Sequence, residues 1–393
     1  MSDAASSGAG HTLAAMPRRP RHLKPPAHFL LCLFLAVGPA ALAQAYVAAP
    51  TPVRVLLATA PEVTVIASGP HRVITAAGRA TTPAGLAWPV TVRGGALVVD
   101  GHDVGANLTF EADGGTLEVA GRRYRGSIRL SAVGDAVEVV NVLDLEAYLR
   151  GVVPAEMAAS WPLEALKAQA VAARSYTLTS LDPTARYDLC ATDECQVYRG
   201  VEAEHPRTDE AIAATAGVVV TYQGEAARTY YHSDSGGAVA SSQEVWGTRI
   251  PYLVAFQDVQ TSGPHRAWTA RLDPRLVSAS LAAAGVGVGA VTSLRVVRVS
   301  ESGRVAALEV TGSGGSRVLE GVQLRSLARG WGLKSMRFSV TGGLDLKGAG
   351  WGHGVGMSQY GARALALSGY DYGRILGHYY PTTALTRFVA GGR

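Results

Sequence analysis

The segment from Glu146 to Met157 contains the residue best suited to acid–base chemistry. Glu156 follows a short apolar run, lies two residues beyond Pro154 and precedes a long helix-like segment. A carboxyl group in apolar surroundings has a raised pKa, which is what a general acid needs near neutral pH. An exposed glutamate beside a helix would give the same pattern. The residues alone leave both interpretations open.

Two further stretches combine small polar residues with glycine. The first runs from Tyr231 to Gly237, where two serines and paired glycines could turn backbone N–H groups toward a ligand, although ordinary turns have the same composition. The second runs from Gly350 to Ala362, where alternating glycines surround Trp351 and His353 and allow close approach of the backbone. A ligand site and a tightly packed core segment both remain possible for it.

The common enzyme signatures are absent from the sequence. It contains no HExxH, no P-loop and no GxSxG, and no pair of carboxylates at short spacing is evident. Glu164, Lys167 and Arg174 share one face of a helix-like segment. That face is either solvated or forms the polar wall of a cleft.

Cys190 and Cys195 are separated by four residues. In an oxidising compartment such a pair forms a small disulfide loop. A pair of metal thiolates is the alternative, but zinc usually needs four ligands and no histidine lies in or immediately beside this loop. We therefore expect a disulfide and no bound metal.

Both strands and helices are expected to position these residues. Short alternating runs and Gly or Pro turns predict a β-rich region over residues 44–135. A strand over 136–142, a short helix over 145–149 and a long helix over 162–180 follow. The long helix is rich in alanine, so neighbouring elements can pack close to it.

The remaining chain continues this mixed pattern. We expect a helix over 208–215, a hairpin pairing 218–222 with 228–232, weak alternating elements over 270–345, a strand over 344–347 and helices over 358–367 and 372–378. The fold class is therefore α+β.

Composition limits the function classes. The chain has 393 residues, of which 48% are hydrophobic and 17% charged, so it can form a sizeable core. Its formal charge is only +5. Much of that charge lies in the first 43 residues, which argues against nucleic-acid binding as the main role.

The N-terminus has the layout of a secretory signal peptide. Basic residues within 18–24 precede an apolar run over 29–37, a Gly-Pro break and Ala41-Leu42-Ala43 before Gln44. We expect cleavage after Ala43 and export to the periplasm, cell wall or exterior. An uncleaved segment that anchors the protein in the membrane is the alternative.

The three stretches together resemble the stage II sporulation protein D family, also called the SpoIID/LytB group. The resemblance rests on the run from Val139 to Tyr176, on Cys195-Gln196-Val197-Tyr198, on residues 247–258 and on the motif from Gly352 to Ala362. It covers roughly residues 125–385. It implies a SpoIID-like catalytic domain over 136–385, with short strands and a long central helix, after the β-rich region.

The resemblance implies a peptidoglycan lytic transglycosylase. Such an enzyme cuts between N-acetylmuramic acid and N-acetylglucosamine on peptide-stripped strands, leaves a 1,6-anhydro end and needs no cofactor. The family's catalytic glutamate falls on Glu156. Further residues expected to bind substrate are Lys167, Arg174, Tyr176, Ser233, Ser235, Gly236, His353 and Gln359.

Two points qualify the resemblance. Some family members bind zinc near the cysteine pair, but Glu194 stands where a histidine often precedes the second cysteine, and Tyr187 offers no replacement ligand. The family also includes proteins described as enhancers of a cell-wall amidase, which act without obvious catalysis. A non-catalytic enhancer with an amidase as partner is therefore the alternative function.

Overall fold

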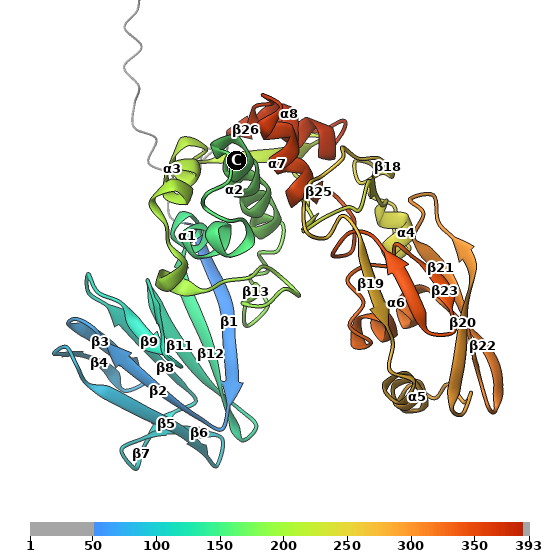
Figure 1. Ribbon diagram of the computed structural model, residues 1–393. Coiled ribbons are helices and arrows are strands. Elements are labelled where there is room, and N and C mark those ends of the chain that lie inside the picture. The colour runs from blue at the N-terminus through green and yellow to red at the C-terminus, as the bar shows by residue number, and fades with distance from the viewer. Residues whose placement is uncertain (1–50, 388–393) are drawn as a thin grey trace, which may run out of the picture. The chain divides into compact units, whose positions relative to one another are not determined.

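The computed structural model describes residues 51–387, and Figure 1 shows their arrangement. The expected signal peptide, residues 1–43, lies outside the described residues. No helix between residues 51 and 387 has the length and apolar character needed to cross a membrane. Helices and strands are both abundant, which confirms the mixed α and β content.

Two sheets make up the N-terminal region. Their strands are β1 (Pro52–Ala60), β2 (Glu62–Ala67), β3 (His71–Thr75), β4 (Gly78–Thr82), β5 (Ala87–Arg93), β6 (Ala96–Val99), β7 (His102–Gly105), β8 (Asn107–Ala112), β9 (Leu117–Val119), β10 (Arg122–Tyr124), β11 (Ser127–Val133), β12 (Ala136–Asp144) and β13 (Leu189–Cys190). One sheet has the order β13-β1-β12-β11-β8-β3-β4, and the other β10-β9-β2-β5-β6-β7. Buried side chains from both sheets form one hydrophobic core.

The boundary expected at residues 135/136 does not separate two domains. β12 pairs with β1 on one side and β11 on the other, so it is an inner strand of the N-terminal sheet. Its alternating apolar residues belong to that sheet's core. The chain leaves this sheet where β12 ends, at Asp144. The Asp144 side chain accepts a hydrogen bond from the Glu146 N–H and caps the start of the next helix.

A group of helices follows the sheets. It comprises α1 (Leu145–Glu156), α2 (Leu163–Leu178), the 3₁₀ helix η1 (Gly200–Ala203), α3 (Pro206–Ala214), α4 (Ser242–Trp246), α7 (Gln359–Leu367) and α8 (Tyr372–Tyr379). α2 lies among α1, α3, α7 and α8 (Figure 1). Its alanines contribute to two hydrophobic cores, one shared with the N-terminal sheets and one shared with α7 and α8. Small side chains permit this close packing on several sides.

The expected hairpin between 218–222 and 228–232 is wrong. The strands concerned are β14 (Val218–Tyr222), β15 (Glu225–Ala226), β16 (Tyr231–His232), β17 (Ala238–Val239), β18 (Phe256–Gln257), β25 (Met357–Ser358) and β26 (Ala384–Arg387). β14 pairs with β15 and β26, whereas β16 pairs in parallel with β25. The turn after β14 joins it to β15, and these two strands pair over only two residues. The longer pairing of β14 is with β26, which is distant in sequence. As a result, β16 lies beside the stretch from Gly350 to Ala362, which contains β25 and is called the glycine-rich stretch below.

Residues 268–348 form a segment with its own hydrophobic core. Its elements are β19 (Trp268–Arg271), α5 (Pro274–Ala283), β20 (Val291–Val299), β21 (Val305–Gly312), β22 (Gly315–Glu320), α6 (Gly321–Gly330), β23 (Phe338–Gly342) and β24 (Asp345–Gly348). They form two three-stranded sheets, β20-β21-β22 and β19-β24-β23. The expected single domain over 136–385 thus contains an insertion, which we call the inserted segment (268–348).

Candidate functional site

A pocket of about 700 Å³ lies where elements distant in sequence meet. The end of α1, the disulfide loop, β16, α4, α6, the glycine-rich stretch and the start of α7 all contribute to it. The lining residues are Glu156, Tyr176, Asp193, Glu194, Cys195, Val197, Tyr230, Tyr231, His232, Ser233, Trp246, Arg329, Trp351, Gly352, His353 and Gln359. All three stretches identified in the sequence therefore reach one pocket.

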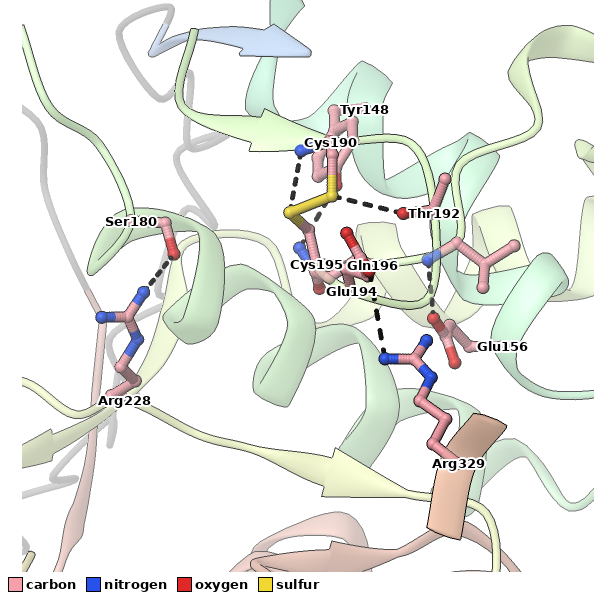
Figure 2. Close-up of a disulfide and its surroundings, with 11 residues drawn as sticks. Tyr148, Glu156, Ser180, Cys190, Thr192, Glu194, Cys195, Gln196, Arg228 and Arg329 are labelled. Atoms are coloured by element: carbon pink, nitrogen blue, oxygen red, sulfur yellow. Dashed lines mark hydrogen bonds and ion pairs between the residues drawn. A yellow bond between two sulfur atoms is a disulfide. The ribbon is translucent and has the colours of Figure 1, made fainter. Parts of the chain in front are cut away.

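Glu156 is the last residue of α1. The following Met157 is buried, and its N–H bonds to the Val153 carbonyl, so the carboxyl group is held at a fixed helix end. Glu156 Oε1 accepts from the Val197 N–H at 2.9 Å, and Oε2 accepts from Gln359 Nε2 at 3.0 Å. Figure 2 shows Glu156 beside the loop that carries the disulfide.

The environment of Glu156 favours its protonated form. Burial raises the pKa of the Glu156 carboxyl, while hydrogen bonds from Val197, Gln359 and Tyr231 partly oppose that rise. The same carboxyl therefore retains a proton at a higher pH than an exposed glutamate and remains able to ionise. These are the two properties of a group that first donates and then accepts a proton.

Gln359 is positioned by the N-terminus of α7. Ser358 is the N-cap of this helix, and its hydroxyl accepts from the Gly361 N–H at 3.1 Å. The adjacent strand pairing places His232 opposite Ser358. The amide of Gln359 therefore reaches Glu156 across 203 residues of sequence because β25 and β16 fix the start of the helix.

Two histidines line the pocket: His232, which is buried, and His353, which is partly buried. Burial lowers the pKa of His353 to about 4 and lowers the pKa of His232 well below its usual value. Both are therefore neutral near pH 7. Gly352 has a φ of +104°, and a Cβ on it would lie 2.9 Å from His232 Cβ, so this close approach requires glycine.

Aromatic rings form much of the remaining wall. The side chains of Trp246 and Trp351 are both partly exposed. Trp246 packs on Tyr230 with ring centroids 4.3 Å apart, and Tyr230 in turn contacts the edge of Tyr176 at 5.7 Å. The pocket thus combines aromatic ring surfaces with several polar and charged side chains.

The structure brings five of the nine residues expected to act in catalysis or binding to this pocket. They are Glu156, Tyr176, Ser233, His353 and Gln359. The other four, Lys167, Arg174, Ser235 and Gly236, do not line it.

The expectation that Arg174 and Lys167 face substrate is wrong. Arg174 is 1% exposed, donates to both carboxylate oxygens of Glu146 at 2.7 and 2.8 Å, and also donates to the Val218 carbonyl. Lys167 pairs with Glu164 at 2.7 Å. Arg174 therefore points toward the backbone at Ile212 and Val218, and neither it nor Lys167 lines the pocket.

Ser235 and Gly236 do not line the pocket but stabilise the loop that follows β16. The Ser235 hydroxyl donates to Asp258 Oδ2 at 2.6 Å, and Asp258 also accepts from the Tyr379 hydroxyl at 2.9 Å. Gly236 lies close to the backbone at Ala349, where a Cβ would clash. Their role in the structure is to hold the loop after β16.

Cys190 and Cys195 form a disulfide, with their Cα atoms 5.5 Å apart (Figure 2). Cys190 pairs through β13 with β1, while Cys195 and Val197 line the pocket. The disulfide therefore connects the edge of the N-terminal sheet to the backbone that hydrogen-bonds Glu156. Within residues 51–387, no group of three or more His, Cys, Asp or Glu residues is arranged to hold a metal ion.

Several pocket residues were missed by the sequence analysis. Tyr231, His232 and Trp351 lie inside the stretches already singled out, and their place in those stretches was the available signal. Trp246 lies just before a segment on which the resemblance rests. Arg329 belongs to the weakly patterned inserted segment, where no motif indicated it.

Comparison with known proteins gives matches over the same regions. A family model described as "Stage II sporulation protein" (SpoIID) matches residues 133–222, and one described as "Domain of unknown function (DUF8618)" matches residues 266–356. The first covers Glu156 and α2, and the second covers the inserted segment, Trp351 and His353.

Three relatives extend the similarity over most of the chain. An uncharacterised protein of Brachyspira hyodysenteriae is 32% identical over 280 residues, which are 70% of this chain and 74% of that protein. The amidase enhancer of Bacillus subtilis is 32% identical over 291 residues, 61% of this chain and 40% of the relative. Stage II sporulation protein D of Bacillus subtilis is 27% identical over 271 residues, 64% of this chain and 77% of the relative.

The pocket and the matches lead to one classification. The protein is a mixed α and β protein with a partly buried carboxyl group in a pocket that several aromatic rings line. It belongs to the stage II sporulation protein D family.

Proposed function

We propose that this protein is a peptidoglycan lytic transglycosylase. It cleaves the bond between N-acetylmuramic acid and N-acetylglucosamine in peptide-stripped glycan strands outside the cytoplasm. The observation that carries the proposal is the Glu156 carboxyl, whose pKa is raised by burial, at the wall of a 700 Å³ pocket. Trp246 and Trp351 offer partly exposed ring faces against which the C–H faces of sugar rings can pack.

The proposed reaction needs one carboxyl group in two successive roles. Glu156 donates its proton to the glycosidic oxygen, and the bond from that oxygen to C1 of the muramic acid breaks. The Glu156 carboxylate then accepts the proton of the C6 hydroxyl as that oxygen bonds to C1. The products are a 1,6-anhydro end and a free hydroxyl on the departing sugar, with no water consumed and no cofactor required.

The surroundings of Glu156 are consistent with a single catalytic carboxyl. Glycosidases that use water commonly employ a second carboxylate as nucleophile or base. The other acidic residues of the pocket, Asp193 and Glu194, are exposed and face Arg329 instead. The Val197 N–H and the Gln359 amide stabilise the carboxylate that forms after proton transfer.

Product analysis tests this proposal. The purified protein should convert peptide-stripped strands into fragments that end in 1,6-anhydromuramic acid, identified by mass spectrometry. Glu156→Gln should lower the rate by about 10²–10⁴-fold or more, because general acid–base catalysis contributes about that much and Glu156 serves twice. Glu210→Gln, at an exposed position on α3, is the matched control and should cut at the wild-type rate. Cleavage by Glu156→Gln at the wild-type rate would overturn the assignment.

A second function is favoured by one relative. The Bacillus subtilis protein of 32% identity is named an amidase enhancer, although this chain spans only 40% of its length. In that role the pocket would bind glycan without cutting it, and a cell-wall amidase would be the partner. If neither wild type nor Glu156→Gln releases anhydro ends but both accelerate a purified amidase, the enhancer function is correct.

A further inference from the structure

The charges of the pocket are unevenly distributed. Three carboxyl groups line it, from Glu156, Asp193 and Glu194, and the two histidines are neutral because burial lowers the pKa of each. Among the lining residues, all of which lie in the described part of the chain, Arg329 alone carries a fixed positive charge. It comes from the last turn of α6 in the inserted segment.

Arg329 is held by partners that can be exchanged. Its Nη2 lies 3.1 Å from Asp193 Oδ2, and its Nη1 lies 4.0 Å from Glu194 Oε1. Figure 2 shows Arg329 reaching from α6 toward the disulfide loop. The side chains of Arg329, Asp193 and Glu194 are 63%, 74% and 71% exposed. Ion pairs this exposed contribute little to stability, so another carboxylate can replace either acid.

We infer that Arg329 is a specificity-determining residue that binds a carboxylate of the substrate in place of Asp193 and Glu194. The inference rests on the proposed function. On a peptide-stripped strand, each N-acetylmuramic acid carries a lactyl group that ends in a free carboxylate. In a strand that still bears its peptides, the same carboxyl is consumed in an amide bond.

The chemistry of the guanidinium group supports this assignment. Its planar fork matches the two oxygens of a carboxylate and binds an amide less well. Asp193 and Glu194 meanwhile disfavour any anion that does not reach Arg329, because like charges in one pocket repel. Together, the acids and the arginine select a strand with its carboxylate at the correct position.

Binding in the absence of cleavage tests the inference. Two probes are used, stripped glycan strands and the same strands whose lactyl carboxyls are coupled to methylamine by carbodiimide. The Glu156→Gln protein should bind the carboxylate strand at least tenfold more tightly than the amide strand. Glu156→Gln combined with Arg329→Gln should bind both strands with equal affinity.

A matched arginine controls for charge and stability. Arg295 lies in the same inserted segment and pairs with Glu309 at 2.8 Å but does not line the pocket. Glu156→Gln combined with Arg295→Gln should keep the tenfold preference. The changes Asp193→Asn and Glu194→Gln, added to Glu156→Gln, should tighten binding of the carboxylate strand because Arg329 no longer has competing partners.

The outcomes separate the inference from the proposed function. Equal binding of both strands by Glu156→Gln, or a preference that survives Arg329→Gln, overturns the role of Arg329 and leaves the catalytic proposal intact. A carboxylate preference that depends on Arg329, in a wild-type protein that releases no anhydro ends, supports the specificity role and overturns the reaction. Failure of Glu156→Gln to bind either strand overturns both.

Discussion

The elements on the two sides of the pocket hold arginines in different ways, although only Arg329 lines the pocket itself. On the α1–α2 side, Arg174 is 1% exposed and forms two short hydrogen bonds with Glu146. On the side of the inserted segment, the side chain of Arg329 is 63% exposed, and its partners Asp193 and Glu194 are more exposed still. Both arginines face carboxylates, but the Arg174–Glu146 pair is much the less exposed, with side chains that are 1% and 28% exposed.

This difference suits Arg174 to a structural task and Arg329 to the recognition task proposed for it. Breaking a buried ion pair leaves an uncompensated charge inside the protein, so its partners cannot be exchanged during function. An exposed pair loses little when it opens, because water and salt replace the interaction. The α1–α2 side therefore fixes Glu156, while the inserted segment offers a charge that can change partners.

The largest stability effect is expected at Arg174. Arg174→Met should lower the free energy of unfolding by about 3 kcal/mol, because Glu146 loses its partner and the Val218 carbonyl loses a donor. Urea unfolding followed by circular dichroism measures this change. Arg174→Lys keeps the positive charge but lacks the paired N–H donors of the guanidinium group, so its free energy of unfolding should lie between those of Arg174→Met and wild type. A wild-type midpoint for Arg174→Met would show that the buried pair is dispensable and would remove the contrast between the two sides.

The disulfide should have the next largest effect. Replacing Cys190 and Cys195 together with serine removes a short loop closure, which contributes about 2 kcal/mol in the chain-entropy account. The loss should appear in urea unfolding, and reduction of the wild-type protein should reproduce it. Activity should fall as well, because Val197, which donates to Glu156, follows the loop directly. Unchanged unfolding in both experiments would mean that the β13–β1 pairing alone holds this segment.

Local sequence signals predicted much of the fold. The alanine-rich helix expected over 162–180 is observed as Leu163–Leu178, and the strand expected over 136–142 is observed as Ala136–Asp144. These elements can be predicted because their periodicity and turn residues lie within one short stretch of sequence. For Glu156 the sequence left two interpretations open, and the structure agrees with the apolar one, since the preceding run forms the packed face of α1 and Glu156 is partly buried.

Features that depend on distant partners were not predictable from the sequence. β14 pairs with β26, more than 160 residues away, so the local turn suggested the wrong hairpin. The charged stripe on α2 carried no sign that Arg174 points into the interior, because its partner Glu146 lies on another helix. Arg329 reaches the pocket only through the packing of the inserted segment, which has no motif of its own.

A smaller effect is expected from the hydrogen bond between Gln359 and Glu156. Gln359→Leu removes a donor that favours the ionised carboxylate, so the pKa of Glu156 should rise further. Because the proposed reaction starts from the protonated acid, the alkaline limb of the kcat/KM profile should move to higher pH. The maximum rate should fall less than tenfold, since one hydrogen bond contributes about 1 kcal/mol. Gln243→Leu, at an exposed position of α4 that does not line the pocket, should leave the profile in place. A limb that moves to lower pH would contradict the assigned direction.

The smallest stability effect is expected at Arg329, where the contrast with Arg174 is sharpest. Arg329→Gln should change the free energy of unfolding by less than about 1 kcal/mol, because its ion pairs are exposed. Arg295→Gln, with a similarly exposed arginine side chain, should give a change of the same size. Urea unfolding at low and high salt measures both, and added salt should shrink each difference as the charges are screened. A loss at Arg329 as large as that at Arg174 would mean that this arginine anchors α6 to the disulfide loop. If Arg329 were such an anchor, it could not release Asp193 in order to bind a substrate carboxylate. The inference that Arg329 exchanges its partners would then be wrong.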